Sequence, residues 1–256
     1  MLRPHCFVIF AALIGLTQMA AAATTPPPEV ISITDDLEVT RLHDGVWLHT
    51  SWNKYRDMRV PSNGLIVREG DGLVLIDTAW GVASTLALVE WIDENLKLPV
   101  TRAIVTHSHD DRLGGGAVLS ARGIPFSGHP LTVEIARRTN KPAPVALEVL
   151  RDPGSTVQLG ALVVIYPGPG HTVDNIAVWL PGLRMLVGGC AVKSADSTNL
   201  GYIGEADLAA WPGSIRRLMA AVPDDGPIVV VPGHGATGGR ELLTHTLKLL
   251  EAAPRP

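Results

Sequence analysis

Cysteine, basic runs and long apolar stretches are all scarce in this chain of 256 residues. Two cysteines are too few for a disulfide scaffold. No run of Lys or Arg occurs and the formal net charge is −4, which excludes a nucleic-acid partner because phosphate binding needs a basic face. Beyond the N-terminal stretch, no segment is long and apolar enough for a membrane helix, so no membrane anchor is expected.

What the chain does contain is the composition of a globular protein. Hydrophobic residues make up 46% of it, which excludes a disordered chain. Its length fits one large domain or two small ones, and such a chain can bury a sizeable core. Nothing in the sequence indicates an oligomer, so a monomer is the expectation.

The N-terminal stretch has the order of a secretory signal. Arg3 precedes an apolar run from Cys6 to Leu16, and small residues follow at Ala20–Ala23. This order predicts a signal peptide over residues 1–23, a mature chain of residues 24–256 and a periplasmic location. The alternative is a buried N-terminal helix. Cleavage before Thr24 removes Cys6 and leaves Cys190 as the only thiol, either buried and inert or held by a metal.

Alternating strand and helix patterns follow along the mature chain, and they predict an α/β fold with two sheets face to face and helices outside. The expected helices span 84–97, 114–122, 131–140, 205–222 with an interruption near Pro212, and 238–253. The expected strands lie at 46–51, 63–69, 72–78, 100–106, 124–128, 156–167, 175–181, 184–189 and 227–232.

The chemistry-bearing motif is the segment from Thr106 to Arg112, directly after a predicted buried strand. His107, His109 and Asp111 occupy alternate positions there. In an extended segment alternate side chains point the same way, so the three can converge on one or two cations. A polar turn that caps the next helix would explain the aspartates but not both histidines.

Three more ligand-type residues each follow an apolar strand. They are His171, Cys190 and His234, all on loops that contain glycine. Taken singly, each histidine is better explained as a hydrogen-bonded side chain and the cysteine as a buried, inert thiol. Taken together with the motif they make six ligands, enough for two open zinc sites with a water between them.

These segments resemble the class B metallo-β-lactamases, in particular the first, cysteine-bearing subclass, with the Verona integron-encoded type nearest. The resemblance runs from about Val39 to Leu250 and includes LIDTAWG, THSHDDRLGG, YPGPGHTVDN, VGGCA and WPGSI. It implies the αβ/βα four-layer sandwich of that family, with two zinc ions at one edge.

The resemblance also assigns roles to residues. It implies a three-histidine site (His107, His109, His171) and a second site (Asp111, Cys190, His234). Lys193 matches the clamp for the substrate carboxylate, and Arg112, Thr106 and Asp77 match residues that support the ligands, although Asp77 is equally explained as a strand-end cap.

Two positions depart from the pattern. Tyr202 stands where the family often has an asparagine that polarises the lactam carbonyl, with Asn199 nearby, and Lys193 is not the usual residue of the nearest subfamily.

The implied reaction is zinc-dependent hydrolysis of the β-lactam amide bond in penicillins, cephalosporins and carbapenems, which confers antibiotic resistance. A zinc-held hydroxide steadied by Asp111 would attack the carbonyl, with no covalent acyl-enzyme. The alternatives are a related lactone or thioester hydrolase and a zinc-buffering protein without turnover. The segment 50–62 matches a flap over the substrate in this family, and an ordinary hairpin loop is the other interpretation.

Overall fold

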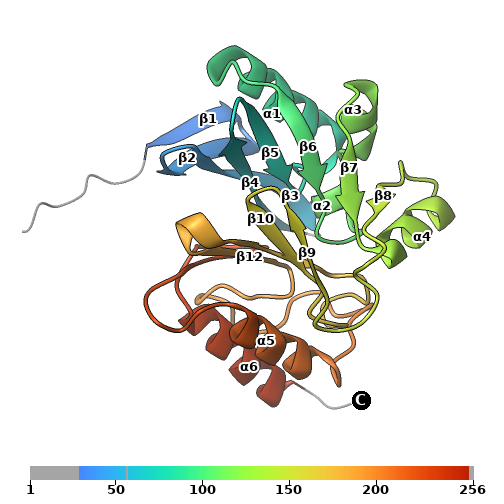
Figure 1. Ribbon diagram of the computed structural model, residues 1–256, viewed down its shortest axis with the longest axis vertical. Coiled ribbons are helices and arrows are strands. Elements are labelled where there is room, and N and C mark those ends of the chain that lie inside the picture. Colours follow the sequence, from blue (N-terminus) through green and yellow to red (C-terminus); the bar gives the residue numbers. More distant parts are fainter. Residues whose placement is uncertain (1–28, 56, 254–256) are drawn as a thin grey trace, which may run out of the picture.

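Two β-sheets face each other at the centre of the computed structural model, which describes residues 29–55 and 57–253 (Figure 1). The first sheet contains eight strands in chain order: β1 (Val30–Thr34), β2 (Leu37–His43), β3 (Val46–Tyr55), β4 (Met58–Glu69), β5 (Gly72–Ile76), β6 (Val100–Ile104), β7 (Phe126–Gly128) and β8 (Val145–Ala146). Strands β1 to β5 pair antiparallel and β5 to β8 pair parallel.

The second sheet has five strands in the order β13-β12-β11-β10-β9. They are β9 (Thr156–Leu159), β10 (Leu162–Ile165), β11 (Ala177–Leu180), β12 (Met185–Gly189) and β13 (Val229–Pro232). Only the β12–β13 pair is parallel, and the other three pairs are antiparallel. Strand β12 is buried along its whole length, as expected of a central strand with both faces covered.

Helices cover the outer face of each sheet (Figure 1). On the first sheet lie α1 (Gly81–Asn95) and α3 (Gly116–Ala121), with α2 (Asp110–Leu113) after β6 and α4 (Pro130–Arg138) beside β8. On the second sheet lie α5 (Trp211–Ala221) and α6 (Glu241–Ala252). In α1 the buried positions Thr85, Leu88, Val89 and Ile92 share one helical face, which packs on the sheet.

Three hydrophobic clusters separate these layers. One lies between the first sheet and its helices, one between the two sheets, and one between the second sheet and α5 with α6. The central cluster joins Ile76 and Ile104 of the first sheet to Val187 and Val231 of the second. The αβ/βα sandwich that the sequence predicts is therefore confirmed.

Some sequence-based expectations differ from the structure. Strands β1 and β2 were not expected, since their alternating polar residues resemble a loop. The helix expected from residue 205 begins only at Trp211, because Pro212 fits the first turn of a helix but not its interior. The short 3-10 helix η1 (Pro181–Leu183) forms the turn between the antiparallel strands β11 and β12.

The segment proposed as a flap is a β-hairpin rather than a loop. Strands β3 and β4 stay paired out to Tyr55 and Met58. Arg59 lies over the ring of Trp52, 4.3 Å from its centroid, and binds Asp36 at 3.1 Å in the turn between β1 and β2.

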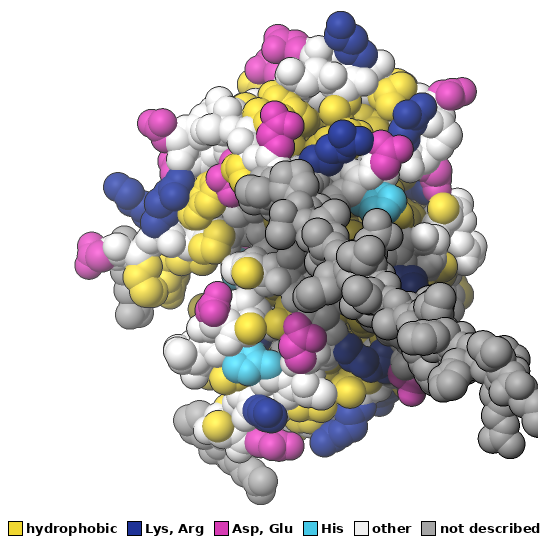
Figure 2. Space-filling model, turned by 90° about the vertical axis from the view of Figure 1, so that its left-hand side faces the viewer, with side chains coloured by type: hydrophobic (Ala, Val, Ile, Leu, Met, Phe, Trp, Pro, Cys, Tyr) yellow, Lys and Arg dark blue, Asp and Glu magenta, His cyan; other side chains and the backbone are white. Residues whose placement is uncertain are grey.

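The surface agrees with the charge balance of the sequence. On the face shown in Figure 2, acidic and basic side chains are interspersed and no single sign dominates. Among the described residues no helix has the length and apolarity needed to cross a membrane. The proposed signal peptide, residues 1–23, lies outside the described residues.

Candidate metal centre

The candidate ligands gather at one edge of the sandwich because of the strand directions. Cys190 directly follows β12, His234 lies two residues after the end of β13, and these two strands are parallel. His171 precedes β11, which runs antiparallel to β12, so it comes to the same edge. His107 and His109 follow β6 of the other sheet.

Three imidazole rings form the first half of the site. The centroid of the His107 ring lies 4.7 Å from that of His109 and 5.0 Å from that of His171, and the remaining pair is 5.1 Å apart. Nδ1 of His109 lies 3.3 Å from Nε2 of His171. Three neutral imidazoles at this spacing suit a tetrahedral zinc site with one open position.

A carboxylate, a thiol and a fourth imidazole form the second half. Sγ of Cys190 lies 3.3 Å from Oδ2 of Asp111 and 3.1 Å from Nε2 of His234, and these last two atoms are 3.5 Å apart. Asp111 also joins the halves, since its Oδ1 is 4.0 Å from Nε2 of His107. Asp111 reaches the site from the first turn of α2, and His107 and His109 lie in a bent segment, so the expected extended alternation is not what brings the three together.

Unpartnered nitrogen atoms show that the site fits a metal ion. His107 is fully buried and neither of its ring nitrogens has a hydrogen-bond partner among the described residues. Burial holds the pKa values of His107 and His171 well below the usual range, and neighbouring positive groups act in the same direction. Buried neutral imidazoles with free lone pairs are what a zinc ion requires.

Arg112 lies beneath the second group and is fully buried. Its Nη2 is 3.1 Å from both Oδ2 of Asp111 and Sγ of Cys190. The same guanidinium donates to the backbone carbonyls of Asn63 and Gly233, the latter at 2.6 Å. One planar fork therefore fixes two candidate ligands and ties both sheets together.

Asp77 and Thr106 support Arg112 from the first sheet. Oδ2 of Asp77 lies 3.3 Å from Nη1 of Arg112, and its Oδ1 accepts a hydrogen bond from the backbone N–H of Thr106 at 2.6 Å. The Thr106 hydroxyl donates to Oδ2 at 2.9 Å. Burial raises the pKa of Asp77 to about 6, although the Arg112 charge lowers it. Asp77 thus connects the ends of β5 and β6 as well as holding the guanidinium, which goes beyond capping a strand.

The charges of the site act most strongly on Asp111 and Cys190. Burial alone would raise the pKa of Asp111, but the Arg112 guanidinium and the nearby histidines hold it well below its usual range. Burial raises the pKa of the Cys190 thiol to about 12, although Arg112 lowers it. Asp111 is therefore a carboxylate at neutral pH, whereas the thiol needs a metal ion to ionise it.

Two glycines allow the ligand loops to lie this close. A Cβ atom on Gly233 would stand 2.7 Å from Sγ of Cys190, so only glycine lets the His234 loop pass beside the thiol. Gly189, just before the cysteine, has a φ of +54°, which favours glycine. His234 is then held in place from the first sheet, because its Nδ1 lies 2.5 Å from the carbonyl oxygen of Pro61.

Lys193 and Tyr202 lie on the chain that follows Cys190. Lys193 is buried, and its ammonium forms no ion pair with a described carboxylate. Tyr202 is 51% exposed, and its ring meets His109 edge-on with the centroids 5.8 Å apart. Asn199, the alternative donor, is exposed and its Oδ1 accepts a hydrogen bond from the backbone N–H of Gly201 at 2.8 Å.

Several residues at the site were not identified from the sequence. Glu205 lies 3.0 Å from Nε2 of His109 through its Oε2. The ring of Trp80 lies 6.3 Å from that of His234, and Trp211 lies beside His171. Trp80 and Trp211 lie in segments that carry the family resemblance, but no spacing in the sequence assigns them or Glu205 a role at the site.

The Glu205 contact leads to a first prediction. If the Glu205 carboxylate accepts the Nε2 proton of His109, the Nδ1 lone pair faces His171 and is free for a metal ion. We expect Glu205→Gln to weaken zinc binding roughly tenfold, measured by competition with a chromophoric chelator. Glu148→Gln, at an exposed residue paired with Arg151, is the control and should leave the affinity unchanged. Equal affinities for the two variants would contradict this role.

The chain is similar to known proteins along most of its length. The sequence model of the metallo-beta-lactamase superfamily matches residues 57–234. A metallo-beta-lactamase type 2 from Bacillus cereus is 37% identical over 253 residues, which cover 95% of this chain and 96% of the relative.

Solved structures with the same architecture are similar as well. A metallo-beta-lactamase from Pontibacter korlensis, 44% identical, superposes with a TM-score of 0.78 over 85% of this chain and 100% of its own. The metallo-beta-lactamase FIM-1 from Pseudomonas aeruginosa, in a mono-zinc form, is 37% identical with a TM-score of 0.79 over 86% of this chain and 98% of its own. By its sequence, its sandwich and its ligand-lined edge, this chain belongs to the metallo-β-lactamase family.

Proposed function

We propose that this protein hydrolyses the β-lactam amide bond of penicillins, cephalosporins and carbapenems, and thereby confers antibiotic resistance. The observation that carries the proposal is the edge where two adjacent ligand groups meet beside Lys193. Relatives named as metallo-beta-lactamases, 34–38% identical over most of the chain, support the same activity.

Two zinc ions are proposed for the site. His107, His109 and His171, whose rings lie 4.7–5.1 Å apart, would hold the first ion. Asp111, Cys190 and His234, whose ligand atoms lie close together, would hold the second. Zinc bound in this way supplies a Lewis acid and lowers the pKa of bound water toward about 7. The structure of the relative FIM-1 was solved in a mono-zinc form. The number of zinc ions bound per chain should therefore be measured.

The side chains around the ions have separate tasks. The Asp111 carboxylate, kept ionised by Arg112, accepts a hydrogen bond from the attacking water and orients it. The Lys193 ammonium binds the substrate carboxylate, for which it has no competing partner among the described carboxylates. The Tyr202 ring lies against His109, and its phenol would donate a hydrogen bond to the lactam carbonyl oxygen.

The finer assignments rest on the sequence. The nearest subfamily is proposed to be the Verona integron-encoded type. Residues 1–23 are proposed as a signal peptide, so that residues 24–256 form the mature domain in the periplasm, working as a monomer.

The deciding experiment is carbapenem hydrolysis by the chain that begins at Thr24. We expect turnover with added zinc, its loss to background on exhaustive chelation, and its return when zinc is restored. Metal analysis should give two ions per chain, and acylating inhibitors of serine enzymes should have no effect. Turnover that survives complete metal removal would contradict the proposal. Two bound zinc ions without β-lactam turnover would favour a lactone or thioester substrate, or a zinc-buffering role.

A further inference from the structure

Trp211 is a buried aromatic residue that the reaction described above does not use. It is the first residue of α5 and has no exposed surface. Its Nε1–H donates to the carbonyl oxygen of Ala191 at 2.9 Å, one residue after Cys190. A Cβ on Gly170 would stand 3.1 Å from Cδ1 of its ring, and the ring centroid lies 6.0 Å from that of His171. The indole thus lies against two of the three loops of the second sheet that carry candidate ligands, those of His171 and Cys190.

The same indole is the neighbour of the Lys193 ammonium. Nζ of Lys193 lies 5.3 Å from the ring centroid, within the distance at which a cation is attracted to an aromatic face. Lys193 is only 7% exposed. A buried ammonium that forms no ion pair is costly unless another group stabilises the charge. Burial lowers the pKa of Lys193, while Cys190 and Asp111 raise it.

We propose that Trp211 is a positioning residue that holds the Lys193 ammonium against its ring, charged but without a carboxylate partner, ready to bind the carboxylate of the substrate. A glutamate or aspartate in this place would compete with the substrate for the ammonium. The indole has no negative charge to be displaced, and its Nε1–H is already bonded to Ala191. This inference rests on the function proposed above, because it assigns the substrate carboxylate to Lys193.

The test compares a β-lactam acid with its methyl ester, which has no anion for Lys193. We expect kcat/KM of the parent to favour the acid, and Lys193→Ala to remove most of this preference. Fluorinated tryptophans are incorporated only at position 211. They keep the shape of the ring and its Nε1–H, but they weaken the attraction of the ring for a cation. We expect the acid-to-ester ratio to fall stepwise with each added fluorine, in total on the order of tenfold, with the change mainly in KM. An unchanged ratio would overturn the proposal, because a merely structural role affects acid and ester alike.

A second measurement does not depend on turnover. The chain has few lysines: Lys54, Lys97, Lys141, Lys193 and Lys248. In protein labelled with ¹³C-lysine, the NMR signal of the Lys193 Hε protons is assigned by its disappearance in Lys193→Arg. We expect the indole ring to shift this signal upfield. Trp211→Leu should remove this shift, whereas Trp211→Phe should keep part of it. Absence of the shift in the parent would overturn the inference. A parent that shows the shift but hydrolyses no β-lactam would contradict the proposed function instead.

Discussion

Replacing Arg112 by methionine should lower the free energy of unfolding of the zinc-free protein by about 3–5 kcal/mol. Methionine fills much of the same volume but leaves the Asp111 and Asp77 carboxylates without their buried cation. The carbonyl oxygens of Asn63 and Gly233 also lose the hydrogen bonds that the guanidinium donates, although that of Gly233 keeps the one from the Asn63 N–H. Removing one partner of a buried charge network costs far more than removing a surface ion pair, because the remaining charges stay in the interior.

Denaturation by urea in the presence of a chelator measures this loss. The matched control is Arg122→Met, since Arg122 pairs with Asp93 at the surface and should change stability by no more than about 1 kcal/mol. Arg112→Lys keeps the charge but loses the planar fork, so it should fall between the two. A loss below about 1 kcal/mol for Arg112→Met would show that the guanidinium is not needed to neutralise the site.

Replacing Asp111 by asparagine should lower kcat/KM for a β-lactam on the order of 10³-fold. The asparagine keeps the size of the side chain but removes the negative charge of a carboxylate that Arg112 and the histidines keep ionised. Oδ2 of Asp111 lies 3.3 Å from Sγ of Cys190 and 3.5 Å from Nε2 of His234. In the variant this position no longer offers an anionic ligand. With the two proposed zinc ions, both the orientation of the water and the binding of the second ion should therefore suffer.

The adjacent residue provides the control. Asp110 has the same charge but its side chain is 67% exposed and pairs with Lys141 at 2.7 Å. We expect Asp110→Asn to change kcat/KM by less than about threefold. Zinc content measured on both variants separates lost binding from lost catalysis. Similar losses of activity in the two variants would mean that charge near the site, and not the position of Asp111, is what the reaction needs.

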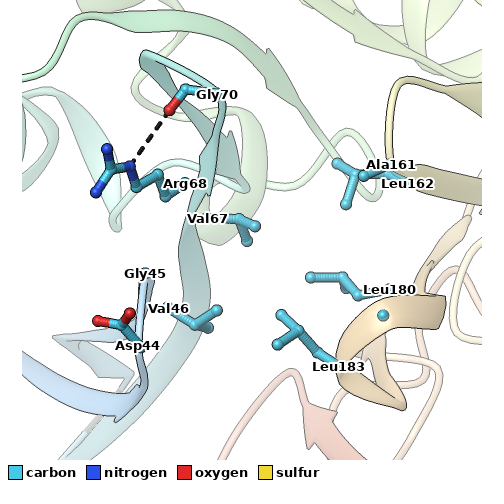
Figure 3. A pocket seen from close by; sticks show the side chains of 11 residues that line it. Asp44, Gly45, Val46, Val67, Arg68, Gly70, Ala161, Leu162, Leu180 and Leu183 are labelled. Atoms are coloured by element: carbon cyan, nitrogen blue, oxygen red, sulfur yellow. Dashed lines mark hydrogen bonds between the residues drawn. The ribbon is translucent and has the colours of Figure 1, made fainter.

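One further feature of the fold is a cavity of about 410 Å³ between the sheets at the edge opposite to the metal centre (Figure 3). Val46, Val67, Leu180 and Leu183 line it, and Asp44 and Arg68 lie at its rim. It is the end of the central hydrophobic cluster, where the sheets separate.

The sequence alone determined the alternation of strands and helices, the sandwich of two sheets, and the six ligand-type residues at strand ends. These features follow from local hydrophobic patterning and residue chemistry, which a linear pattern records directly. The pairing of β1 and β2 and the extension of the β3–β4 hairpin were not determined in this way, because half-exposed strands have little apolar signal.

Only the tertiary structure decided which side chains support the ligands. Glu205 meets His109 across 96 residues of chain, and Arg112 meets Cys190 across 78. Trp211 comes to Lys193 because α5 packs on the second sheet, as its place in the outer cluster shows. Contacts of this kind depend on how layers pack, and layer packing is set by the whole hydrophobic core rather than by spacing within one segment.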